Sequence, residues 1–147
     1  MPTTRSGLTA TITTVVAIVA LALPALAGGR PLSADLNGDN EVPASGSEAT
    51  GTAHFTLNQG RGEICVVVES SGYDEGEIIV AGHIHAGGPG VNMPPLVDFG
   101  VNAANFSNCV DVDPAIVKDI RQNPSDYYFN LHTNLRPGGV IRDQLSK

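Results

Sequence analysis

The sequence predicts an all-β fold, an antiparallel Greek-key-like β-sandwich or barrel with one short helix. Short runs rich in β-branched residues recur along the chain, and turn-forming Gly, Pro, Asn and Ser separate them. Only one segment has apolar residues at helical spacing, and an α+β fold would need more helix than this. No internal repeat or low-complexity tract argues for another architecture.

The first 27 residues are expected to be a signal peptide. Arg5 supplies a positive charge, residues 8–23 are uncharged and largely apolar, and residues 25–27 (Ala-Leu-Ala) have the small-x-small form of a cleavage site. A membrane anchor is the alternative, because the apolar stretch approaches the length that spans a bilayer. No basic stop-transfer cluster follows it, however. We therefore expect one domain over residues 28–147, secreted or in the cell envelope (the periplasm of a two-membrane host) and not held in a membrane.

Six strands are expected in this domain, each bounded by turn residues. They are Thr50–Leu57, Glu63–Ser70, Glu77–His85, Leu96–Phe99, Tyr127–His132 and Val140–Leu145. Residues 58–63 have the composition of a hairpin turn between the first two. Residues 35–41 are interpreted as an opening strand and turn and not as a calcium loop, because Gly46 stands where such a loop needs a bidentate acid.

Residues 113–123 predict the single helix. Asp113 is a suitable N-cap, and a proline follows at the first helical position. Asn123 precedes a second proline that ends the helix. The apolar residues at helical spacing are Ile116, Val117 and Ile120.

The charge balance excludes some partners. The formal net charge of −7 includes Arg5, so the chain without its leader carries −8. It has no basic cluster, and binding to nucleic acid or anionic lipid is therefore not expected.

The two cysteines, Cys65 and Cys109, both lie in the exported part, where oxidising conditions preserve disulfides. An even count in such a chain favours one disulfide over two buried thiols.

Three histidines are candidate metal ligands. His83 and His85 alternate with Ile84 along a strand, so both point to one side. His132 lies on the side of its own strand opposite the large apolar residues, and all three are expected outside the core, under or beside loops. A His-x-His pair with a third imidazole binds copper or zinc and leaves a coordination position open. The alternative is that the pair hydrogen-bonds the following glycine-rich loop and only holds it.

Other polar residues receive more ordinary interpretations. Arg142 is a possible accessory residue that neutralises an anion near the histidines, but a salt bridge to a carboxylate is the commoner role of a strand arginine. His54 is expected to be exposed. The sequence has no Gly-x-Ser-x-Gly elbow and no activated thiol, so we expect no catalytic residues and no enzyme activity.

Five stretches occur in the order of the CHRD domain, named after chordin, and cover nearly the whole chain after the leader. They are LNGDNEVP at 36–43, GTAHFTL at 51–57, AGHIHAGGPGVNMPP at 81–95, NPSDYYFNLHT at 123–133 and RPGGVIRDQL at 136–145. The resemblance implies an antiparallel β-sandwich or barrel that binds partners and does not catalyse. Met93 and Asp143 stand where the family usually has glycine.

A fainter resemblance links residues 60–88 to copper,zinc superoxide dismutase, in which a His-x-His on a strand binds copper outside the barrel. It implies copper ligation by His83 and His85, with His132 as a third ligand. No histidine lies between His85 and Cys109, so the bridging imidazole and the zinc loop have no counterparts. Superoxide dismutase activity is therefore not expected.

The sequence thus predicts a secreted protein with a single CHRD-type domain that acts as an extracellular or envelope binding module. Its partner would be an extracellular protein or a matrix component. The alternative is a copper- or zinc-binding protein that uses His83, His85 and His132. A second alternative is a structural coat or matrix component, in which the histidines organise the loop at residues 87–100.

Overall fold

The structure, a computed structural model, describes residues 29–147. The predicted signal peptide lies outside the described residues. The strands are β1 (Arg30–Asn37), β2 (Thr50–Asn58), β3 (Glu63–Ser71), β4 (Ile79–Ala86), β5 (Pro95–Asp98), β6 (Phe106–Asp111), β7 (Tyr127–Thr133) and β8 (Ile141–Gln144). The helices are α1 (Pro114–Gln122) and the short 3₁₀ helix η1 (Pro124–Asp126). No helix in this part of the chain is long and apolar enough to cross a membrane.

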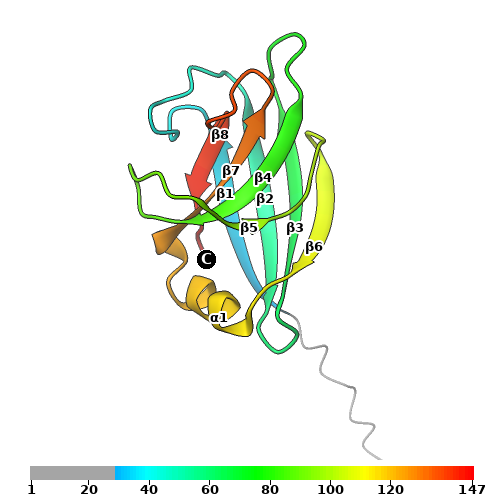
Figure 1. Cartoon of the computed structure of the whole chain (residues 1–147), viewed down its shortest axis with the longest axis vertical. Coiled ribbons are helices and arrows are strands. Elements are labelled where there is room, and N and C mark those ends of the chain that lie inside the picture. The colour runs from blue at the N-terminus through cyan, green and yellow to red at the C-terminus, as the bar shows by residue number, and fades with distance from the viewer. Residues whose placement is uncertain (1–28) are drawn as a thin grey trace, which may run out of the picture.

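The strands form one sheet in the order β5-β4-β7-β8-β1-β2-β3-β6, with neighbours antiparallel. The sheet curves into a nearly closed barrel (Figure 1). The edge strands β5 and β6 are linked where Asn108 donates a side-chain hydrogen bond of 2.7 Å to the backbone oxygen of Phe99. The predicted all-β class with one short helix is confirmed.

The core lies inside the barrel, because alternate residues of each strand point inward. Along β2 and β3 the buried alternate positions are apolar except for Ser70, and the outward positions are polar or partly exposed. Three phenylalanines meet at the centre, with the Phe55 ring 5.3 Å from Phe129 and 6.2 Å from Phe99 between centroids. Burial of these side chains is the main favourable contribution to folding.

The helix closes one end of the barrel (Figure 1). The carboxylate of Asp113 accepts a hydrogen bond of 2.7 Å from the backbone nitrogen of Ala115, which is the predicted N-cap. Val117 and Ile120 face the core and are fully buried. The predicted helix is therefore confirmed at both ends and on its apolar face.

The loops between β1 and β2, β3 and β4, and β7 and β8 gather at the opposite end (Figure 1). Arg136 holds them together. Its guanidinium donates to both oxygens of Glu77 at 2.7 and 2.8 Å, to Asp74 at 2.7 Å, and to the backbone oxygen of Ser45 at 3.3 Å. This network fixes the backbone that follows Arg136. The carbonyl oxygen of the next residue, Pro137, lies 3.0 Å from His132, one of the candidate metal ligands.

Two strands were not fully expected from the sequence, and two others have different bounds from those predicted. Only the end of β1 was expected, and β6 was not expected, because most of its side chains are exposed and show no apolar alternation. Pairing with β3 makes β6 a strand. The predicted strand over residues 77–85 begins instead at Ile79, where pairing with Thr133 of β7 starts, because the Glu77 backbone nitrogen bonds Asp74 in the preceding turn. The last strand is shorter than predicted at both ends.

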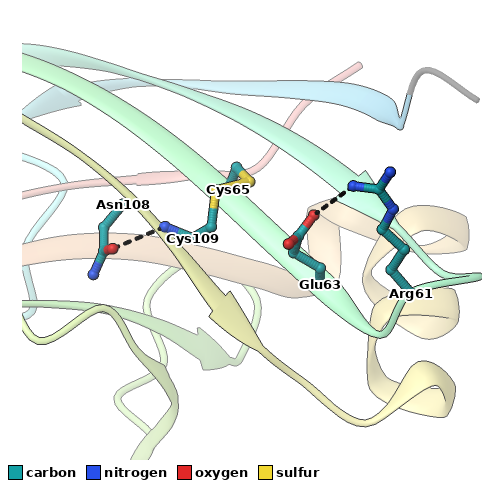
Figure 2. The surroundings of a disulfide bond; sticks show 5 residues. All are labelled: Arg61, Glu63, Cys65, Asn108 and Cys109. Carbon is teal, nitrogen blue, oxygen red and sulfur yellow. Dashed lines mark hydrogen bonds and ion pairs between the residues drawn. A yellow bond between two sulfur atoms is a disulfide. The ribbon is translucent and has the colours of Figure 1, made fainter. Parts of the chain in front are cut away.

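The two cysteines form a disulfide, as predicted. Cys65 of β3 lies directly opposite Cys109 of β6 in the strand register. Figure 2 shows the bond on the outer face, near the surface ion pair of Arg61 with Glu63 at 3.8 Å. Because β6 is an edge strand with few buried side chains, the disulfide fastens it to the sheet.

Candidate metal site

The three candidate histidines lie together on the outer face of β4 and β7. His83 and His85 point to the same face of β4, as the alternation predicts, and His132 lies opposite Ala81 on β7. One ring nitrogen from each histidine lies within 4.8 Å of the others. The described residues contain no other such group of histidine, cysteine or acidic side chains. The tertiary structure therefore brings His132 to the His-x-His pair.

The outer face is covered at this place, although it lies outside the barrel. The chain between β4 and β5 folds back over the sheet, and Arg142 of β8 anchors it. The guanidinium donates to the backbone oxygens of Gly88 and Val91 and to the side chain of Asn92. As a result His85 is only 4 % exposed. His83 and His132 are half-buried.

His132 has one ring nitrogen in use and one free. Its Nδ1 donates a hydrogen bond of 3.0 Å to the backbone oxygen of Pro137. Because Pro137 follows the clamped Arg136, this carbonyl has a fixed position. The proton on Nδ1 leaves a lone pair on Nε2, which is buried and has no hydrogen-bond partner.

His83 has a similar arrangement with its nitrogens exchanged. Its Nε2 lies 3.5 Å from the carboxylate of Asp98, which favours a proton on that atom. The lone pair is then on Nδ1, and this atom is also buried without a hydrogen-bond partner. A histidine that ligates a metal characteristically donates its other ring N–H to a carboxylate or a backbone carbonyl. His83 and His132 both have a partner of this kind.

His85 differs because both of its ring nitrogens are engaged. Nδ1 lies 2.7 Å from the backbone oxygen of Met93, and Nε2 lies 2.9 Å from the side-chain amide of Asn130. Both contacts are to oxygen atoms, so the ring donates the N–H that it carries, from Nδ1 to the Met93 carbonyl or from Nε2 to Oδ1 of Asn130. Loop holding, the alternative role of the histidine pair, therefore fits His85.

Burial lowers the pKa of all three imidazoles below the ordinary value of 6.5. For His83, the neighbouring His132 lowers it further, and the Asp98 carboxylate opposes this effect. For His132, the hydrogen bond to Pro137 opposes the effect of burial. The rings are therefore neutral at neutral pH, which is the form that coordinates metals.

The His85 ring is packed on Tyr128, which in turn is packed against Arg142. Its ring lies parallel to that of Tyr128, with 4.6 Å between centroids. The Arg142 guanidinium lies on Tyr128, 3.3 Å from the ring centroid. Among the described residues Arg142 makes no salt bridge, so its expected carboxylate partner is replaced by loop carbonyls and this ring. The Arg142 side chain is 1 % exposed, and its role toward an anion beside the histidines stays a prediction.

The site opens into a cavity of about 450 Å³. His83, His85 and His132 line it, together with the apolar side chains of Val80, Met93 and Pro95. An ion bound between the histidines would have one side open to small ligands, and the apolar wall would limit the access of water. His54 lies apart from this cavity on β2 and is exposed, as predicted.

The comparison with models of protein families shows the family to which the chain belongs. The model of the CHRD domain matches residues 32–145. The chain belongs to the CHRD domain family. No curated protein and no solved structure matches it.

Four of the five stretches that resemble CHRD converge on this site. The stretch at 81–95 supplies His83, His85 and the Met93 carbonyl, and the one at 123–133 supplies Tyr128, Asn130 and His132. The stretch at 136–145 supplies the Pro137 carbonyl and Arg142. The opening stretch supplies Glu41, which interacts with Arg142 and Asn130. These CHRD stretches thus form one connected structure on the outer face of the barrel.

Sequence reasoning missed Asn130 and Glu41. Asn130 carried a signal, because the alternation of its strand places it on the same face as His132. Glu41 carried only its place in the stretch at 36–43 that resembles CHRD, since it precedes the histidines by more than 40 residues and stands in a turn. Only the folded chain brings its carboxyl group beside Gly139, where an added Cβ atom would collide with it.

Proposed function

We propose that this CHRD domain is an exported metal-binding module that holds one copper or zinc ion at the three-histidine site. His83 Nδ1 and His132 Nε2 supply two ligands, and His85 can supply a third only by releasing its contact with Met93 or Asn130. The observation that supports this most is the pair of buried ring nitrogens without hydrogen-bond partners. Buried polar atoms are nearly always paired, and two exceptions in one cluster require an explanation.

The donor chemistry favours copper or zinc over other biological cations. Imidazole nitrogens suit both metals, whereas calcium and magnesium require a set of oxygen ligands that the cluster lacks. Two metal–nitrogen bonds of about 2 Å each span about 4 Å. Nitrogens within 4.8 Å of one another therefore need only a small adjustment to share an ion.

Metal titration of the chain without its leader, residues 28–147, tests this proposal. We expect one copper or zinc ion per chain by elemental analysis, and loss of binding in both His83→Ala and His132→Ala. His54→Ala is the matched control, because it removes an exposed histidine of β2 and should retain full binding. Absence of stoichiometric binding, or binding indifferent to the first two changes, would contradict the proposal.

A second candidate function is binding of an extracellular protein or a matrix component. Val80 and Met93, at the cavity, are each 47 % exposed, and Val91 and Leu96 nearby are also exposed. Apolar side chains gathered at a cavity mouth are typical of interaction surfaces. Retention of the domain on the extracellular or envelope fraction of its host tests this, and Met93→Asp should abolish it. Equal retention of the variant and the natural chain would exclude this surface.

A further inference from the structure

We infer that Asn130 selects the metal, because it occupies the third histidine and leaves a two-nitrogen site that suits copper(I) better than zinc(II). This inference rests on the proposed function and assigns the metal of the same site. It follows from three observations: the state of the His85 ring, the rigidity of its surroundings, and the number of ligands that each metal requires.

The ring of His85 has no nitrogen to offer while Asn130 is in place. Its Nε2 lies 2.9 Å from the Asn130 amide, and its Nδ1 lies 2.7 Å from the Met93 carbonyl. A nitrogen that carries a proton cannot coordinate an ion, and each His85 nitrogen also faces an oxygen atom that occupies the direction of its lone pair or N–H. The site therefore presents the two free nitrogens of His83 and His132.

Neither partner in the Asn130–His85 contact is free to turn away. Asn130 is 3 % exposed and lies in the middle of the sheet, opposite His83 on one side and Arg142 on the other. The His85 ring is stacked on Tyr128, and Arg142 holds Tyr128 in place. Release of His85 Nε2 therefore requires a rearrangement of buried, hydrogen-bonded side chains, which disfavours a metal that needs it.

The two candidate metals differ in the number of ligands they require. Zinc(II) is nearly always four-coordinate, and its open sites use three protein ligands with water in the fourth position. Copper(I) is a monovalent d¹⁰ ion that is stable with two nitrogen ligands in a nearly linear arrangement. His83 and His132 alone satisfy copper(I), whereas zinc(II) must also recruit His85. The contact of Asn130 with His85 thus lowers the zinc affinity and leaves the copper(I) affinity intact.

The test compares zinc(II) and copper(I) affinities of the natural chain and of Asn130→Ala. Each metal is titrated alone against a chromogenic chelator, and copper(I) is titrated without oxygen. Loss of a hydrogen-bonded partner that supports a metal ligand lowers affinity by about 10-fold or more; Asn130 instead blocks the ligand, so its loss should raise affinity by a factor of similar size. We expect zinc affinity to rise about 10-fold and copper(I) affinity to stay the same. Asn102→Ala, which removes an exposed amide from the loop before β6, should change neither affinity.

The His85→Ala substitution completes the test. In the natural chain it should leave copper(I) affinity nearly unchanged, and in the Asn130→Ala background it should remove the gain in zinc affinity. An unchanged or lower zinc affinity in Asn130→Ala would overturn the inference. If Asn130→Ala does not fold, the single variants His85→Ala and His132→Ala provide the test. The inference is overturned if His85→Ala loses as much copper(I) affinity as His132→Ala does. A natural chain that binds neither metal refutes the proposed function itself, which is a different result.

Discussion

Replacement of Glu41 by Gln should stabilise the protein above neutral pH and have little effect in acid. The Glu41 side chain is 6 % exposed, and one of its carboxyl oxygens has no hydrogen-bond partner. Burial raises the pKa of this carboxyl group from 4.5 to about 7, against the opposing effects of the Arg142 charge and of hydrogen bonding by Asn130. The folded protein therefore favours the neutral acid, and glutamine resembles that form.

The magnitude and the pH window follow from the two pKa values. Below pH 4.5 the group is protonated in the folded and the unfolded chain, so it has no effect on the pH dependence. Between pH 4.5 and about 7 the unfolded chain loses the proton first, and the free energy of unfolding falls as pH rises. The loss is complete above that range and amounts to about 3 kcal/mol, since each pKa unit corresponds to about 1.4 kcal/mol.

Urea unfolding of the metal-free protein at several pH values measures this effect. The difference in unfolding free energy between Glu41→Gln and the natural chain should grow from acid to neutral pH and then stay constant. The lowered pKa values of the histidines make stability fall below pH 6.5, but they do so in both proteins and cancel in the difference. Glu48→Gln, an exposed change of the same charge in the same loop, should show no such growth. A difference for Glu41→Gln that does not vary with pH would refute the assignment of a buried neutral acid.

Two further predictions concern stability. Replacement of Cys65 and Cys109 by serine should lower the free energy of unfolding by about 2–4 kcal/mol, because the disulfide closes a long loop at an edge strand. Thermal unfolding with and without reductant measures this effect. An unchanged melting temperature would contradict the prediction. Arg136→Met should cost about 3–5 kcal/mol, because it leaves the fully buried Glu77 carboxylate without its cation. Addition of Glu77→Gln should recover part of that loss in urea unfolding, and no recovery would show that the ion pair is not the cause.

The sequence alone determined the local structure and the faces of the strands. The capped helix follows from Asp113 and the proline after it, and the disulfide follows from two cysteines in a chain with a predicted signal peptide. Strand alternation places His83, His85 and His132 outside the barrel. These features depend on neighbouring residues or on a count, so each can be recognised from the order of amino acids.

The tertiary structure decided which nitrogens are free. The approach of His132 to His83 depends on the pairing of β4 with β7, and the burial of His85 depends on a loop held by Arg142 of β8. Asn130 at His85 and Glu41 near Asn130 are likewise contacts between distant segments. A hydrogen bond depends on tenths of an ångström between side chains. Periodicity reports only the face on which a side chain lies, so the sequence predicts three outward-facing histidines but not that they meet or which of them can bind a metal.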